Sequence, residues 1–211
     1  MTPREQHNVL TAAAVLAQLE RHGMTGAYAT SAAEALAQLQ AFLQPGKTVS
    51  FGGSMTLEEI GFFSAAEASG CTLIDRRTAQ TEEERQQIYQ QAFGADVFFM
   101  STNAITLDGK LVNVDGNGNR LAMLLFGPKK VVVVAGMNKV CRDEAAAIER
   151  IHRIAAPVNA IRLGRDTPCA HTGVCGDCHS PDCICAQTVI TRHCKPEGRI
   201  HVILVGEDLG Y

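Results

Sequence analysis

Apolar residues are distributed along this chain in two recurring patterns. Short segments that are apolar throughout, such as 97–100 and 131–135, are typical of strands covered on both faces. Longer segments repeat an apolar residue every three or four positions, which is typical of helices with one buried face. Strands are therefore predicted at 48–51, 71–74, 97–100, 104–106, 111–114, 131–135, 187–191 and 200–205, and helices are predicted to begin at Pro3, Ser31, Thr56, Thr81, Asn119 and Arg142. This alternation predicts an α/β protein with a mostly parallel open sheet and helices on both faces.

Capping residues and turns mark the boundaries of these elements. The spacing of a capping box recurs at Thr2–Glu5, Thr56–Glu59 and Thr81–Glu84. The helix that begins at Thr56 is predicted to run to Gly70, and the one that begins at Arg142 to run to Ala155. Asp108-Gly109 predicts a hairpin turn between the strands at 104–106 and 111–114. A turn at 195–198 separates the two final strands.

Composition narrows the class of protein. The chain has 211 residues, which predicts a single α/β domain over 1–211, and its net charge of −3 gives no reason to expect nucleic acid or an anionic membrane as a partner. No apolar run approaches the ~20 residues that a membrane helix needs, so we expect no membrane span. No export signal is evident, which favours a cytoplasmic protein. Nothing in the sequence sets the oligomeric state.

Ligands of open parallel sheets bind beyond the carboxyl ends of the strands, so the loops there are the candidate site. The first such loop is predicted to bind an anion through Gly52, Gly53, Ser54 and Thr56, since glycines expose backbone N–H groups and hydroxyls add donors. The alternative is that the glycines make a turn and Thr56 caps a helix. Glu59 is better explained as part of the cap than as a catalytic group.

Two further loops follow predicted strands. Ser101-Thr102-Asn103 ends the strand at 97–100, and Asn103 is a candidate ligand contact, although such residues also satisfy local backbone groups. The loop 113–120 contributes Asn117, Asn119 and Arg120. A cation at a helix start opposes the helix dipole, and a bound carboxylate or phosphate at Arg120 would resolve that conflict. Lys139 is a candidate anion contact after the strand at 131–135, the alternative being a surface lysine.

Three motifs together resemble the lactate-utilisation (LUD) domain family: Gly52-Gly53-Ser54-Met55-Thr56, then Asn103-Ala104-Ile105-Thr106 through Asp108-Gly109, then Asp115-Gly116-Asn117-Gly118-Asn119-Arg120. The resemblance covers about residues 4–164. It implies the fold of a wider superfamily of sugar-phosphate isomerases, coenzyme A transferases and formyltetrahydrofolate cyclo-ligases, which place substrate anions on strand-end loops. It also implies possible iron–sulfur partner proteins, because some relatives act with such partners in oxidising lactate to pyruvate.

A short cysteine-rich segment over 167–194 lies within the predicted domain and holds six of the eight cysteines. It is similar to a C-terminal segment of the short single-domain branch of the same family. That resemblance implies that Cys169, Cys175, Cys178 and Cys185 are metal ligands and that Cys183 and Cys194 are not. Four thiolates suit a [4Fe–4S] cluster or tetrahedral zinc. The cluster is favoured and zinc is the alternative, with a redox dithiol or inert thiols also open.

Two classes of function remain open at this stage. The first is a lactate-utilisation type of enzyme, or a subunit of one, that acts on a small anionic organic acid and carries a four-cysteine site; no catalytic residue is identified. The second is an electron-transfer or redox-sensing module whose functional site is the cysteine segment. A third possibility is a non-redox transferase or isomerase with a structural zinc.

Overall fold

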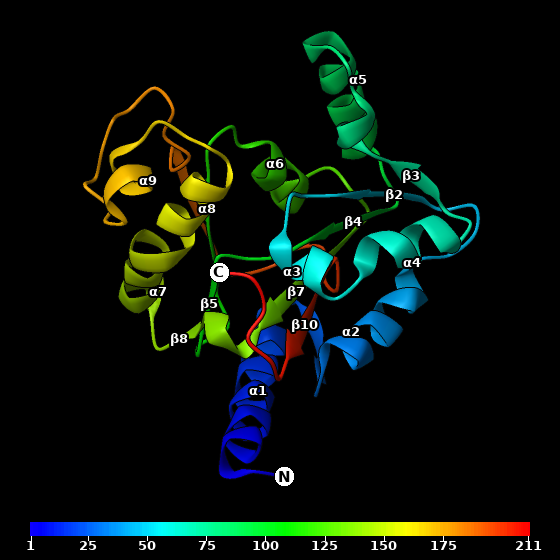
Figure 1. Cartoon of the computed structure of the whole chain (residues 1–211). Coiled ribbons are helices and arrows are strands. Elements are labelled where there is room, and N and C mark those ends of the chain that lie inside the picture. Colours follow the sequence, from blue (N-terminus) through cyan, green and yellow to red (C-terminus); the bar gives the residue numbers. More distant parts are fainter.

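The computed structural model describes all 211 residues and is built around a parallel sheet of six strands in the order β1-β10-β7-β4-β2-β3 (Figure 1). These strands are β1 (Thr25–Ala29), β2 (Thr48–Phe51), β3 (Thr72–Ile74), β4 (Val97–Met100), β7 (Lys130–Gly136) and β10 (Ile200–Val205). The central pair, β10 and β7, is in register from Ile200 opposite Val131 to Val205 opposite Gly136. The predicted fold class, a mostly parallel sheet in an α/β protein, is confirmed.

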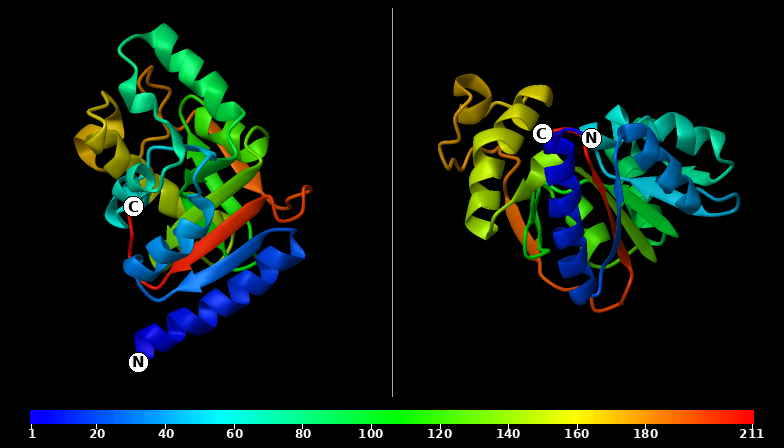
Figure 2. Two further views of the ribbon diagram at one scale, coloured as in Figure 1. Left: turned by 90° about the vertical axis from the view of Figure 1, so that its right-hand side faces the viewer. Right: turned by 90° about the horizontal axis from the view of Figure 1, so that it is seen from below.

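Helices cover both faces of this sheet, and the side chains of β7 show the division. Val131 and Val133 point into a core formed with α1 (Pro3–Arg21), α5 (Glu82–Phe93) and α6 (Asn119–Leu125). Val132 and Val134 point into the opposite core, formed with α2 (Ala32–Leu39), α3 (Met55–Glu59) and α4 (Phe62–Ala68). Figure 2 shows α1 running beside β1, the edge strand of the sheet. A strand with both faces buried explains its uninterrupted run of valines.

A second, smaller sheet stands beside the first in the order β8-β5-β6-β9. Its strands are β5 (Ala104–Thr106), β6 (Leu111–Asp115), β8 (Val140–Cys141) and β9 (Gln187–Thr191). It is covered by α7 (Glu144–Arg150), a π-helical turn (Ile151–Ala155) and α8 (Ala156–Arg162), and α9 (Pro168–Thr172) opens the cysteine segment. Three 3-10 turns, Gln40–Phe42, Arg76–Thr78 and Met137–Lys139, complete the elements. None of the helices is both long and apolar enough to cross a bilayer.

Several predicted boundaries were wrong. Ser54, not Thr56, caps α3, because its hydroxyl accepts from Leu57 N–H while Thr56 lies inside the helix. The helix expected to run to Gly70 is divided at Gly61 into α3 and α4. The helix expected to end at Ala155 continues through the π turn into α8.

The pairing of the strands also differs from the pattern that the sequence suggested. β1 and β8 had no sequence signal: β1 contains a glycine and is mostly exposed or half-buried at the sheet edge, and β8 has only two residues. The strands on either side of the turn at 195–198 do not pair with each other, because β9 pairs with β6 and β10 with β7 and β1. Strand partners are chosen by tertiary packing, which a local sequence pattern does not record.

Candidate anion-binding cavity

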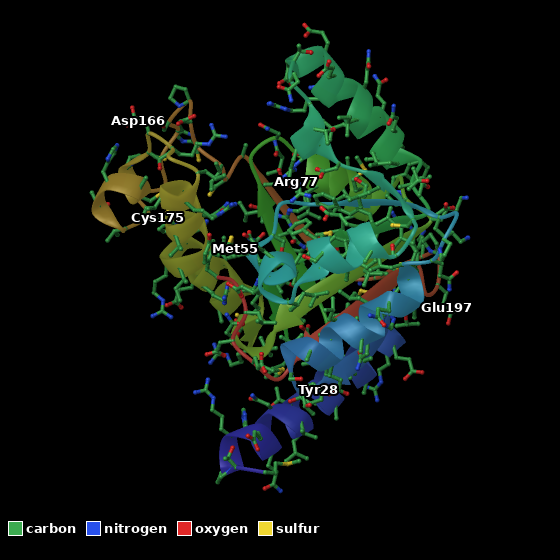
Figure 3. All side chains as sticks on the ribbon, turned by 45° about the vertical axis from the view of Figure 1, so that its right-hand side comes forward. Tyr28, Met55, Arg77, Asp166, Cys175 and Glu197 are labelled. Carbon is green, nitrogen blue, oxygen red and sulfur yellow. The ribbon has the colours of Figure 1, made fainter.

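The carboxyl ends of the parallel strands open into one polar cavity of about 300 Å³. Its walls come from the loops after β2, β3, β4, β6, β7 and β10, from α8, and from residues 181–184 of the cysteine segment. Figure 3 shows Met55, at the start of α3, on the side that faces α8 across this region. Parallel strands end at the same edge, so loops far apart in sequence meet there.

Seven of the eight residues predicted for ligand binding lie in the walls of this cavity: Gly53, Ser54, Thr56, Asn103, Asn117, Asn119 and Arg120. Gly52 is not part of the wall, although its backbone packs against the Arg120 side chain. The three loops therefore converge as expected. That these residues bind a ligand stays a prediction.

Arg120 holds the loops of the cavity together. Its guanidinium donates to the carbonyl oxygens of Ser101 and Val114 and to the side-chain oxygens of Asn113 and Asn103, at 2.6–3.2 Å. Its Nε lies 3.3 Å from a carboxylate oxygen of Asp115. A protein carboxylate, rather than a bound anion, thus resolves the conflict with the helix dipole. With its donors used in this way, Arg120 positions neighbouring loops.

Lys139 is a buried cation with no carboxylate partner. Its side chain is not on the surface, because only 4% of the residue is exposed. Nζ donates to Thr56 Oγ1 at 2.8 Å and to Ser101 Oγ at 3.0 Å. Burial, together with the nearby positive charge of Arg150, lowers the pKa of Lys139 to about 7. At neutral pH this amine is therefore present in both its charged and its neutral form.

Arg76 is a second cation of the cavity, and its guanidinium makes no hydrogen bond or ion pair with the protein. Its neighbour Arg77 differs, because it pairs with Asp75 at 2.7 Å and lies over the ring of Phe63. The Arg76 guanidinium rests against Gly53, where an added Cβ would lie 2.5 Å from Nη2. The sequence did not distinguish Arg76, because pairs of adjacent arginines are common in proteins. Its position just after β3 is the feature that could have indicated a residue of the site.

Positive charge exceeds negative charge around this space. The basic residues of the wall are Arg76, Arg120, Lys139, Arg162 and Arg165, and its acidic residues are Asp115 and Asp182. Both carboxylates are already paired, Asp115 with Arg120 and Asp182 with Arg165. Arg162 donates to Asn159 on its own helix. Arg76, Lys139 and Arg162 therefore lack an anionic partner, and of these three only Arg162 is exposed.

The cysteine segment forms one side of the cavity. Cys183 lies in the wall, and the Cys185 N–H points to the Cys183 sulfur at 3.4 Å. Burial and the neighbouring thiols of Cys183, Cys175 and Cys169 raise the pKa of Cys185 to about 12. Cys194 lies elsewhere, in the core beside α1.

As placed, the cysteines do not form a ligand set. No group of three or more His, Cys, Asp or Glu side chains has the arrangement of a metal site. Cys183, which was not an expected ligand, is one of the thiols that raise the pKa of Cys185. The residues in this arrangement do not fit a zinc ion or a cluster without movement of the chain.

Comparison with known proteins identifies the family. The family model of the LUD domain matches residues 12–205, which is most of the chain. The chain belongs to the LUD domain family. Among curated proteins, none matches this sequence.

One solved structure shows the same fold, and two others are similar over part of the chain. A DUF162 family protein from Deinococcus radiodurans is similar over 94% of this chain and 98% of its own, with a TM-score of 0.55 and 13% identity. Ribose 5-phosphate isomerase from Plasmodium falciparum matches 51% of each chain at a TM-score of 0.32 and 18% identity. The delta subunit of eIF2B from Chaetomium thermophilum matches 66% of this chain and 54% of its own at a TM-score of 0.35 and 14% identity. The Deinococcus protein thus shares the whole architecture of this LUD domain.

Proposed function

We propose that this LUD domain protein binds a small anionic organic acid, of the size and charge of lactate, in the cavity at the carboxyl ends of the strands. The observation that supports the proposal is that Arg76 and Lys139, the two less exposed of the three cavity cations without anionic partners, lie in the wall of one polar cavity. A buried charge without a counter-ion costs stability, and a bound carboxylate supplies that counter-ion. The proposal covers either an enzyme or the ligand-binding subunit of one.

Each part of the site has a distinct role in this proposal. The Arg76 guanidinium presents parallel N–H donors that suit a carboxylate. Lys139 supplies a second donor at the buried end, where Thr56 and Ser101 hold its amine. Arg120 positions Asn103, whose side-chain oxygen is occupied by Arg120 and by the Val114 N–H, so that only its amide nitrogen is left for a ligand.

Calorimetric titration with lactate and with pyruvate tests this proposal. Arg76→Met should weaken binding about ten- to hundredfold, the equivalent of one charge-assisted hydrogen bond. Arg142→Met is the matched control, because Arg142 is a largely exposed arginine outside the cavity. If wild type binds neither acid, or if Arg76→Met binds as tightly as Arg142→Met, the proposal is wrong.

We further propose that the cysteine segment binds a metal through four thiolates, a [4Fe–4S] cluster in preference to zinc. The support is the number of thiols and the grouping of Cys169, Cys175 and Cys183 near Cys185. Residues 174–186 contain no helix or strand, so bringing the sulfurs together breaks no regular hydrogen bonding. Either Cys178 or Cys183 would supply the fourth ligand. Iron–sulfur partner proteins would suit a cluster at this position.

Metal analysis of protein prepared without oxygen tests this second proposal. A brown, reducible sample that contains iron and sulfide would favour an electron-transfer role for the segment. A colourless sample with one zinc ion per chain would favour a structural role. Cys178→Ser and Cys183→Ser, compared with the distant Cys194→Ser, identify the fourth ligand by loss of metal. Neither iron nor zinc in the wild-type protein would rule out the metal site.

A further inference from the structure

The Lys139 amine has more chemistry available to it than binding an anion. It is buried at the bottom of the cavity, and two hydroxyl oxygens, Thr56 Oγ1 and Ser101 Oγ, fix its position at 2.8 and 3.0 Å. These contacts take two of the positions around a tetrahedral nitrogen, and Cε takes a third. In the neutral amine the remaining position carries the lone pair.

The charges that face this amine are mostly positive. Arg150 on α7 and Arg120 on α6 disfavour the ammonium form, and Glu59 on α3 favours it. Glu59 makes no ion pair with the amine, and its carboxylate accepts the Gly210 N–H at 2.6 Å. Burial is the largest cause of the shift, and together with the arginines it lowers the pKa of Lys139 to about 7. A buried lysine beside other cations is the usual environment of a nucleophilic amine.

We infer that Lys139 forms a covalent imine with a carbonyl-bearing acid, a 2-oxo acid whose carboxylate is held by Arg76. This inference rests on the anion-binding function proposed above and names the ligand class of that cavity. A 2-oxo acid carries its electrophilic carbon next to the carboxylate, so one cavity can hold the carboxylate and present the carbonyl to the amine.

Imine formation between the Lys139 amine and the carbonyl group requires only proton transfers and the loss of one water molecule. The nitrogen lone pair attacks the carbonyl carbon, and the C–O π electrons move to oxygen, which takes a proton to give a carbinolamine. Loss of the oxygen as water, with both amine hydrogens, forms the C=N bond. The hydroxyls of Thr56 and Ser101, at 2.8 and 3.0 Å from the amine, are the groups that can pass a proton from the nitrogen to the oxygen.

Reductive trapping tests the imine. Wild-type protein is incubated with pyruvate and cyanoborohydride, which reduces an imine to a stable amine, and the modified lysine is located by peptide mass spectrometry. At pH 7 an amine with a pKa of about 7 is about half neutral, whereas an ordinary lysine is neutral in less than about one molecule in a thousand. We therefore expect Lys139 to be labelled at least about tenfold faster than the exposed Lys47.

Lys130 is the matched control inside the same protein. It is partly buried at the opposite end of β7, outside the cavity, and its amine donates to the Gly198 carbonyl. Lys139→Arg should lose the adduct and Lys130→Arg should keep it. If Lys139→Arg does not fold, the pH profile of the wild type replaces it: labelling at Lys139 levels off above about pH 8, whereas the rate for an ordinary lysine would still rise toward about pH 10.

Lactate separates this inference from the proposal on which it rests, because it carries the carboxylate without the carbonyl. An adduct at Lys139 that lactate suppresses supports both. Binding of lactate and pyruvate with labelling only at exposed lysines overturns the imine and leaves the anion site standing. An adduct at Lys139 that lactate does not suppress contradicts the shared anion site, and the absence of both binding and adduct overturns both.

Discussion

Single residues at the cavity differ in whether their charge is already paired. Arg120 resembles a ligand-binding arginine in sequence, yet its donors are used by Asp115, two asparagines and two backbone carbonyls. Arg76 has no such partner. Sequence position could place both residues at strand ends, but only the distances between side chains separate the structural arginine from the available one.

Replacement of Arg120 should destabilise the protein. Arg120→Met leaves Asp115, whose side chain is only 9% exposed, without its cation, and a broken buried pair costs about 3–5 kcal/mol. Urea unfolding measures this loss. Arg142→Met, at a side chain 82% exposed, should stay within about 0.5 kcal/mol of wild type. Equal stabilities of the two variants would contradict the role given to Arg120.

Lys139 should make stability depend on pH. A lysine in the unfolded chain titrates near about 10.4, while the pKa of Lys139 in the folded protein is about 7. Between these values the unfolded chain binds a proton that the native state does not, so the free energy of unfolding rises with pH. Below about pH 7 both states are protonated and the full cost of the buried charge is present.

Lys139→Met isolates this contribution. Relative to wild type, the variant should lose stability as the pH is raised from about 7 to about 10, by up to about 1.4 kcal/mol per pH unit. Urea unfolding of both proteins across this range gives the difference. A difference that is constant with pH would show that Lys139 titrates as an ordinary lysine.

Helices and strands were predictable where their signals are local. The capping boxes at Thr2–Glu5 and Thr81–Glu84 begin α1 and α5, and the apolar run at 97–100 is β4. Elements that depend on partners were missed. β1 is stabilised by pairing with β10, and α8 continues from α7 through a π turn that leads into the segment containing Pro157.

The hairpin between β5 and β6 offers a test of such a partner. Gly109 in its turn has φ 80°, and an added Cβ would lie 2.9 Å from the backbone of α1 at Gln18 and Leu19. Gly46 has nearly the same φ, 78°, with nothing within 4 Å of an added Cβ. Gly46→Ala should cost about 1–2 kcal/mol for the left-handed backbone alone. Gly109→Ala should cost about 1–3 kcal/mol more, because the methyl group meets α1.

Thermal and urea unfolding of the two alanine variants measure this difference. Since the two glycines have nearly the same φ, the difference reports the contact between the hairpin turn and α1. Equal losses would mean that the hairpin turn does not pack against α1.

At the scale of the whole molecule, residues that follow β10 form part of the cavity wall, namely Gly210 and Tyr211. Leu209 is buried against α3 and the end of β7, its carbonyl accepts from Thr56, and its N–H donates to Asn138. Leu209→Ala should cost about 2–5 kcal/mol, as for other buried leucines. Leu125→Ala, at a leucine 58% exposed, is the control and should change stability by less than about 0.5 kcal/mol. Denaturant midpoints that agree for the two variants would place Leu209 outside the core.

The sequence by itself determined the α/β class, the strand-end loops and the segment in which the cysteines gather. These follow from local physics: the periods of strands and helices, the preferences of capping residues, and the rule that parallel strands end at one edge. The second sheet, the pairing of β9 with β6 and the burial of Lys139 were decided only by the tertiary structure. A lysine has the same sequence signature on the surface and in a cavity, and its chemistry changes only when packing removes the water around it.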